Sequence, residues 1–105
     1  MEKEYFIIYR SDEKSIPSDW RLIYTIWFGD SPEYCTVYKV KDDNDLRNWR
    51  KLLKSSLIHK FDLITKDELI VDIQKIKEMN NSKDINYITK IDLKPKVLHE
   101  LNIKI

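Results

Sequence analysis

Residues 19–41, DWRLIYTIWFGDSPEYCTVYKVK, are rich in aromatic and β-branched residues on both sides of one short polar segment. That segment, GDSPE at 29–33, combines residues that supply positive φ, side-chain turn bonds and a fixed φ. The pattern predicts an antiparallel hairpin with a loop of about five residues. In its first strand, alternation assigns one set of residues to the core-facing side: Trp20, Leu22, Tyr24, Ile26 and Phe28.

The segments on either side of the hairpin predict a third strand and two helices. Residues 4–10, EYFIIYR, form a continuous apolar run typical of a central strand buried on both faces. Residues 45–60, DLRNWRKLLKSSLIHK, place apolar residues at helical spacing, with Asp43, Asn44 or Asp45 as the cap. Thr65 and Glu68 match a capping box, which predicts a second helix over residues 66–79.

The remaining segments are shorter. Residues 61–64 are interpreted as an apolar connector, and residues 85–93 fit a strand or a helix, with β-branching favouring the strand. Pro95 is expected to begin a short helix, and residues 101–105 alternate like a terminal strand. We therefore expect one α+β domain over residues 1–105. It has two layers, with an antiparallel sheet of three N-terminal strands, one or two more near the C-terminus, and two helices on one face.

Composition narrows the class of protein. A chain of 105 residues with 42% hydrophobic and 35% charged residues is expected to fold around a core without disulfides or metals. Cys35 is the only cysteine and Gly29 the only glycine, which disfavours disulfide scaffolds and glycine-rich phosphate loops. No apolar run approaches the roughly 20 residues that cross a bilayer, so a cytoplasmic location is expected.

The predicted helix at 45–60 carries the strongest charge pattern in the chain. The net charge of the whole protein is +1, but residues 46–60 hold five cations and no acidic residue: Arg47, Arg50, Lys51, Lys54 and Lys60. Their spacing places most of them on one side of the helix, where they are candidates for binding carboxylates or phosphates. The alternative is a solvated face balanced by acidic neighbours such as Asp62, Asp67 and Asp72.

The hairpin aromatics suggest a second candidate surface. Trp27 falls on the strand face opposite the expected core residues, and an exposed Trp is a typical interface residue. Exposed aromatics beside basic residues also suit base stacking, although the signatures of RNA-recognition sheets are absent. For most of these aromatics we favour a place in the core.

Groups for catalysis are sparse. His59 and His99 are far apart in the sequence, and neither has a second ligand at metal-binding spacing. Cys35 lies within a predicted strand, where a buried, inert thiol is the favoured interpretation. An enzyme built from Cys35, a histidine and acidic residues is therefore the least favoured hypothesis, and we expect neither a cofactor nor a metal.

The leading hypothesis is a non-enzymatic protein-interaction or inhibitor module. Its size and fold class match those of small immunity-type or anti-defence proteins, and it would bind an acidic partner through the basic helix. The alternative is a nucleic-acid-binding regulator that places the same helix on phosphates. The low net charge and the acidic second helix count against this alternative. The sequence does not define an oligomeric state.

Overall fold

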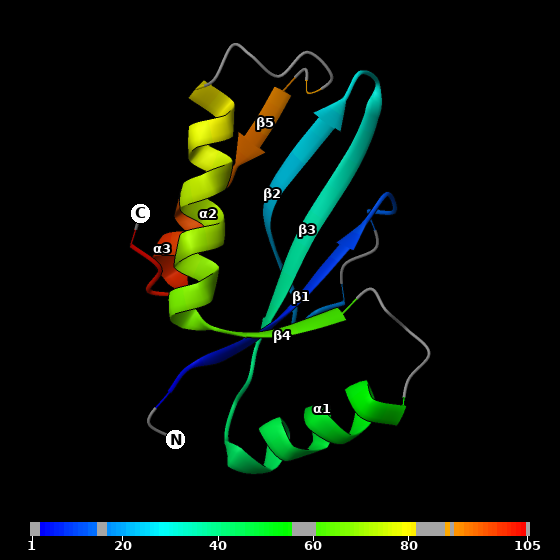
Figure 1. Cartoon of the computed structure of the whole chain (residues 1–105), viewed down its shortest axis with the longest axis vertical. Coiled ribbons are helices and arrows are strands. Elements are labelled where there is room, and N and C mark those ends of the chain that lie inside the picture. The colour runs from blue at the N-terminus through cyan, green and yellow to red at the C-terminus, as the bar shows by residue number, and fades with distance from the viewer. Residues whose placement is uncertain (1–2, 15–16, 56–60, 82–87, 89, 105) are drawn as a thin grey trace.

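A computed structural model describes residues 3–14, 17–55, 61–81, 88 and 90–104. In this part of the chain one antiparallel sheet has the strand order β4-β1-β3-β2-β5 (Figure 1). The strands are β1 (Tyr5–Ser11), β2 (Arg21–Phe28), β3 (Ser31–Lys39), β4 (Phe61–Thr65) and β5 (Lys90–Leu93). The helices are α1 (Asp43–Ser55), α2 (Lys66–Asn81) and α3 (Pro95–Glu100). The α+β class and the antiparallel sheet are as expected.

The predicted hairpin is formed by β2 and β3, but its turn is tighter than expected. Only Gly29 and Asp30 lie between the strands, and Phe28 is opposite Ser31. Gly29 has a φ of 64°, and the φ of Asp30 is not positive, which is the pattern of a type II′ turn. Pro32 is tolerated in β3 because β1 ends opposite Tyr34, so Pro32 has a strand neighbour on one side only.

An irregularity in β2 changes which residues share a face. Leu22 lies opposite Thr36 while Tyr24 lies opposite Cys35, so Ile23 is an extra residue in the ladder. Beyond this bulge the alternation is shifted by one residue. The prediction that Trp20 and Tyr24 share a face is therefore wrong, because they pack in different clusters on opposite faces of the sheet.

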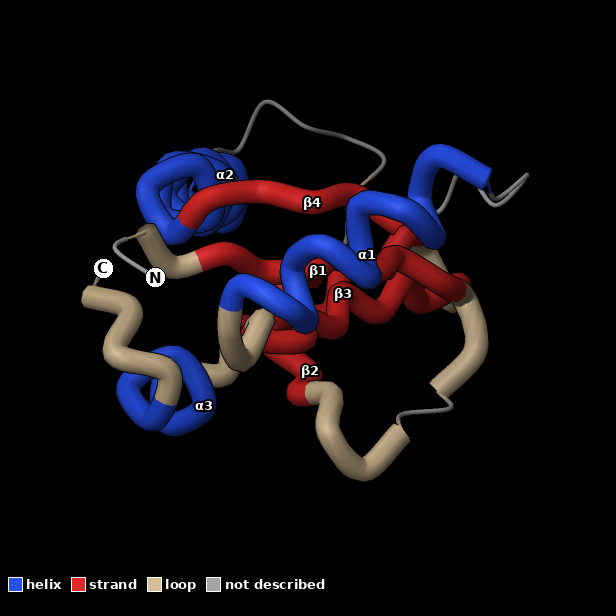
Figure 2. The backbone as a smooth tube through the Cα atoms, turned by 90° about the horizontal axis from the view of Figure 1, so that it is seen from below, coloured by secondary structure: helices blue, strands red, loops and turns tan. Residues whose placement is uncertain are grey.

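Helices cover both faces of the sheet, whereas we expected both predicted helices on one face. Phe6 and Ile8 of β1 point to the side of α2 and α3, and Ile7 points to the side of α1. The physical reason lies in β1 itself, which is apolar on both faces. In a two-layer fold one of these apolar faces would be exposed to water. Figure 2, viewed from below Figure 1, shows α1 apart from α2 and α3.

The larger cluster joins the sheet to α2 and α3. Its buried members are Phe6, Ile8, Ile23, Tyr24, Ile26, Cys35, Val37, Leu69, Ile73, Ile76, Ile91, Leu98 and Ile103. The smaller cluster joins the sheet to α1. Its buried members are Ile7, Tyr38, Val40 and Leu46, with half-buried Tyr5, Trp20, Trp49, Leu53, Phe61 and Leu63 around them.

The segment interpreted as a connector forms an edge strand. β4 pairs with β1, from Tyr5 opposite Thr65 to Tyr9 opposite Phe61. α2 follows without a loop, and its capping box is formed as predicted. The Glu68 amide donates to Thr65 Oγ1 at 3.2 Å, and the Thr65 amide donates to Glu68 Oε1 at 3.2 Å.

The C-terminal segment confirms one prediction and corrects another. β5 lies within the predicted strand, of which residues 85–87 and 89 are outside the described residues, and α3 begins at Pro95. The terminal strand is absent from residues 101–104. Asn102 has a φ of 58°, the Asn102 amide donates to the His99 carbonyl, and the Ile103 amide donates to the Leu98 carbonyl. This is a Schellman motif, and it turns Ile103 into the core.

None of the helices within the described ranges is both long and apolar enough to cross a membrane.

Candidate functional site

The basic helix predicted from the sequence is α1, at the lower end of the molecule in Figure 1. Leu46, Trp49 and Leu53 pack toward the sheet. Four exposed cations lie within about a third of the helix circumference, and we call them the basic ridge: Arg47, Arg50, Lys51 and Lys54. Lys60 and His59 lie outside the described residues.

The cations of the basic ridge have no carboxylate partner within the described part of the chain. Arg50 contacts the Tyr5 ring, with its guanidinium carbon 5.6 Å from the ring centroid. By contrast, the two arginines on the strands are paired, Arg10 with Asp62 and Asp72 and Arg21 with Glu100. The ridge therefore presents charge that the described fold does not neutralise.

The start of α1 is held to β3 by a small polar network. The Asp45 amide donates to Asp42 Oδ1 at 2.8 Å, so the cap is Asp42 rather than one of the three residues we expected. The Asp45 carboxylate accepts the Lys41 amide at 2.9 Å and the Tyr38 hydroxyl at 2.7 Å. Burial, together with this hydrogen bond to Asp45, raises the pKa of Tyr38 to about 12.

Aromatic rings hold the inner side of α1 against the sheet. Trp49 lies between the ring of Tyr38 at 5.5 Å, that of Trp20 at 6.1 Å and that of Phe61 at 6.3 Å, measured between centroids. Such tilted and edge-on pairs add to the free energy of burial. Leu52, in contrast, is 54% exposed. With Asp45, Asn48 and Trp49 it lines a hollow of about 100 Å³ on the flank of α1 away from the basic ridge.

Trp27 is not part of the same surface as the basic ridge. It is half-buried, and it lies opposite Pro32 and Lys90 near the end of β2. The turn of the β2–β3 hairpin and α1 are at opposite ends of the molecule (Figure 1). The structure thus brings the four cations of α1 together and leaves Trp27 apart from them.

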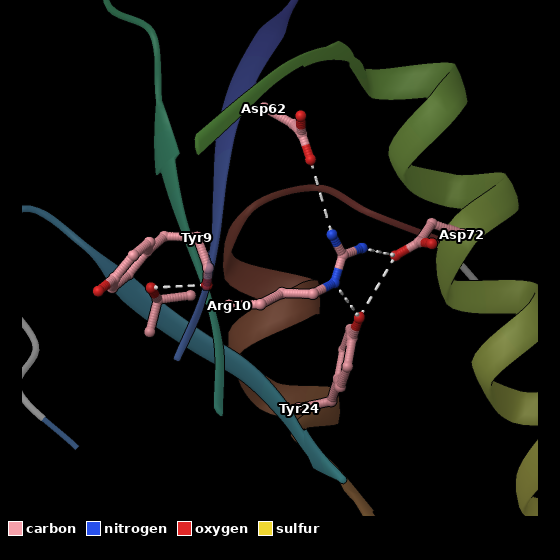
Figure 3. Close-up of polar contacts among 6 residues, drawn as sticks. Tyr9, Arg10, Tyr24, Asp62 and Asp72 are labelled. Carbon is pink, nitrogen blue, oxygen red and sulfur yellow. Dashed lines mark hydrogen bonds and ion pairs between the residues drawn. The ribbon is translucent and has the colours of Figure 1, made fainter. Parts of the chain in front are cut away.

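The acidic residues that the alternative hypothesis places beside the basic helix lie on the other side of the sheet. Asp62 and Asp72 both face Arg10, at 3.8 Å and 3.3 Å from its terminal nitrogens (Figure 3). Arg10 Nε also donates to the Tyr24 hydroxyl at 3.4 Å, and this hydroxyl donates to Asp72 at 3.5 Å. These side chains join β1, β2, β4 and α2 in one network, which the sequence pattern did not reveal.

Cys35 lies at the inner end of this network. It is fully buried, as expected, and burial raises the pKa of its thiol to about 12. Burial also raises the pKa of Tyr24. At neutral pH Cys35 is a protonated thiol rather than a nucleophilic thiolate. Among the described residues, no three His, Cys, Asp or Glu side chains are grouped so that they could hold a metal ion.

A groove of about 550 Å³ runs between the β1–β4 edge of the sheet and α2. We call it the acidic groove. Ile8, Ile64 and Val71 supply apolar surface, Asp62, Asp67, Glu68 and Asp72 supply carboxylates, and Arg10, Leu63 and Lys75 complete the lining. Sequence analysis missed it because its walls come from three elements whose pairing is not local. The one available signal was the set of acidic residues at 62, 67, 68 and 72.

Comparisons with protein-family models, with curated proteins and with solved structures found no match to this chain.

Proposed function

We propose that this protein is a non-enzymatic binding module whose basic ridge docks on an acidic surface of a protein partner. The observation that carries the proposal is the contrast among the four arginines. The two on strands are paired with carboxylates, and Arg47 and Arg50 on α1 have no ion pair among the described residues. Unpaired guanidinium groups on a rigid helix are available for bidentate contacts with carboxylates.

The seating of α1 supports this role. The aromatic contacts of Trp49 and the capping network at Asp45 fix both the rotation and the start of the helix. The cations are therefore presented in a defined arrangement rather than on a loose segment. Preorganisation of this kind lowers the entropic cost of association, and a cluster of one sign of charge accelerates the encounter with an acidic surface.

A protein partner is favoured over nucleic acid by what surrounds the basic ridge. Arg50 of the ridge lies against the half-buried ring of Tyr5, at 5.6 Å from its centroid, and aromatic side chains next to arginine are typical of protein interfaces. The nucleic-acid-binding regulator remains the second candidate, because the ridge cations also suit phosphates. A ridge that occupies an acidic surface of the partner would also prevent other molecules from binding there, which is the basis of an inhibitory role.

The test compares binding of a fluorescent polyglutamate peptide and a fluorescent DNA duplex to three forms of the protein by anisotropy. The ridge variant carries Arg47→Glu, Arg50→Glu, Lys51→Glu and Lys54→Glu. The control variant carries the same reversal at Lys77, Lys90, Lys96 and Lys104, which are exposed and have no ion pair among the described residues. In each variant the four reversals together lower the net charge from +1 to −7.

We expect the peptide to bind the wild type in a salt-sensitive way and to bind the ridge variant about tenfold or more weakly, since four pairs of roughly 0.2–1 kcal/mol are lost. The control variant should lose much less affinity. Equal losses in the two variants would show that only net charge matters and would contradict the proposal. Binding of the duplex in preference to the peptide would instead support the second candidate function, a nucleic-acid-binding regulator.

A further inference from the structure

The molecule carries two exposed surfaces of opposite charge. The basic ridge holds four cations, and the acidic groove holds four carboxylates with Arg10 and Lys75. One exposed large apolar side chain, Val71, is 49% exposed and lies in the groove. Leu52, 54% exposed, lies on the opposite flank of α1 from the ridge. The two surfaces thus carry charges of opposite sign, and the groove adds apolar surface.

We propose that the acidic groove is the docking site for the basic ridge of a second copy of this chain. This inference rests on the proposed function, because it names the acidic partner of the ridge. It follows from charge complementarity between surfaces that belong to the same molecule. Its consequence is self-association through two different surfaces, which adds one copy to the next.

The basic ridge cannot reach the acidic groove of its own chain. α1 packs on one face of the sheet through Leu46, and α2, which forms a wall of the groove, packs on the other face through Leu69 and Ile73. The contact must therefore be between molecules. In such a head-to-tail contact each added copy leaves one ridge and one groove open, so the assembly grows with protein concentration.

Within the groove, the carboxylates differ in their availability. Asp72 and Asp62 face Arg10, whereas Asp67 is exposed and has no ion pair among the described residues. Ile8, Ile64 and Val71 offer apolar surface. A groove of about 550 Å³ admits a few side chains rather than a whole helix. The groups that enter it are accordingly the side chains of ridge cations.

The contact is small, so the association is weak and depends on salt. Interfaces well below about 1,200 Å² are typical of transient complexes. Exposed charges are screened over about 10 Å at 0.1 M salt and over about 3 Å at 1 M. In sedimentation equilibrium at low salt, we expect the weight-average mass to rise above the 12.8 kDa of the monomer as protein concentration increases. At high salt it should return to that of the monomer.

Two variants separate the two surfaces. The ridge variant, with Arg47, Arg50, Lys51 and Lys54 changed to Glu, keeps the groove. The groove variant, Asp67→Lys with Val71→Lys, keeps the ridge, the Thr65–Glu68 capping box and the ion pairs of Arg10. Each variant alone should remain a monomer. An equimolar mixture should form dimers and nothing larger, because it contains one compatible ridge and one compatible groove per pair.

The lysine control variant, Lys77, Lys90, Lys96 and Lys104 to Glu, has the same net charge as the ridge variant. It should associate far more strongly than the ridge variant if the contact is specific. Circular dichroism establishes that each variant is folded before its mass is measured.

A wild type that stays monomeric at low salt overturns the proposal, as does a mixture of the two variants that stays monomeric. A groove variant that associates as strongly as the wild type also overturns it. In each of these cases the polyglutamate experiment still decides the proposed function, because it uses an acidic ligand that does not come from this chain.

Discussion

Tyr38 links the sheet to the start of α1, and we expect its ionisation to lower the stability of the protein in alkali. Its side chain is buried and its hydroxyl donates to Asp45 at 2.7 Å. Ionisation would place a second negative charge against that carboxylate. For this reason, and because of burial, the pKa of Tyr38 is raised from 10.0 to about 12 in the folded protein.

The sign of the pH dependence follows from that shift. Above pH 10 the unfolded chain loses the Tyr38 proton first, so the unfolded state binds fewer protons and the free energy of unfolding falls. The contribution of Tyr38 is complete below pH 10 and is lost as the pH rises through 12. We predict that the stability difference between the wild type and Tyr38→Phe, measured by urea unfolding, shrinks over this range. The other titrating groups are common to both proteins, so a constant difference would contradict the assigned environment of Tyr38.

Structural features were predicted correctly from the sequence where the residues that determine them are neighbours in the chain. The capping box of Thr65 and Glu68 and the start of α3 at Pro95 need only a few adjacent residues, and both are formed. The bulge at Ile23 was missed because the alternation of side chains in β2 does not reveal an extra residue. It becomes visible only in the pairing with β3.

At the scale of the element, α1 is held in position by the side chains along one side of the helix, which pack against the sheet. Leu53 packs in the cluster beneath it, whereas Leu52, its neighbour in sequence, is 54% exposed. We predict that Leu53→Ala lowers the free energy of unfolding by about 1–3 kcal/mol, since Leu53 is only half-buried. Leu52→Ala should change it by less than about 0.5 kcal/mol. Urea unfolding of the two variants measures this, and equal losses would mean that α1 is rotated differently.

β4 shows why some elements escape prediction. Its five residues are too few for a periodic signal, and they become a strand because β1 offers them a partner more than 50 positions earlier in the chain. The same pairing brings Asp62 to Arg10 and creates one wall of the acidic groove. The basic ridge, in contrast, follows from spacing within a single helix, so the sequence alone predicted it.

At the scale of the whole molecule, the sheet connects two clusters that do not touch the same helices. Successive residues of β1 serve opposite sides, with Ile7 packed toward α1 and Ile8 toward α2 and α3. The two clusters share the same strands. Loss of one cluster would therefore expose one face of strands whose other face packs in the remaining cluster. We therefore expect the protein to unfold as one cooperative unit despite its separate helical layers.

Neighbouring substitutions test this expectation. Ile7 is fully buried and Ile8 is 2% exposed, so Ile7→Ala and Ile8→Ala should each lower the free energy of unfolding by about 2–5 kcal/mol. Tryptophan fluorescence reports largely on the α1 side, where Trp20 and Trp49 lie, and far-ultraviolet circular dichroism reports on all helices. In both variants the two signals should change at the same urea concentration. If Ile7→Ala shifts the fluorescence transition alone, α1 and its cluster unfold separately, and the sheet does not couple the two faces.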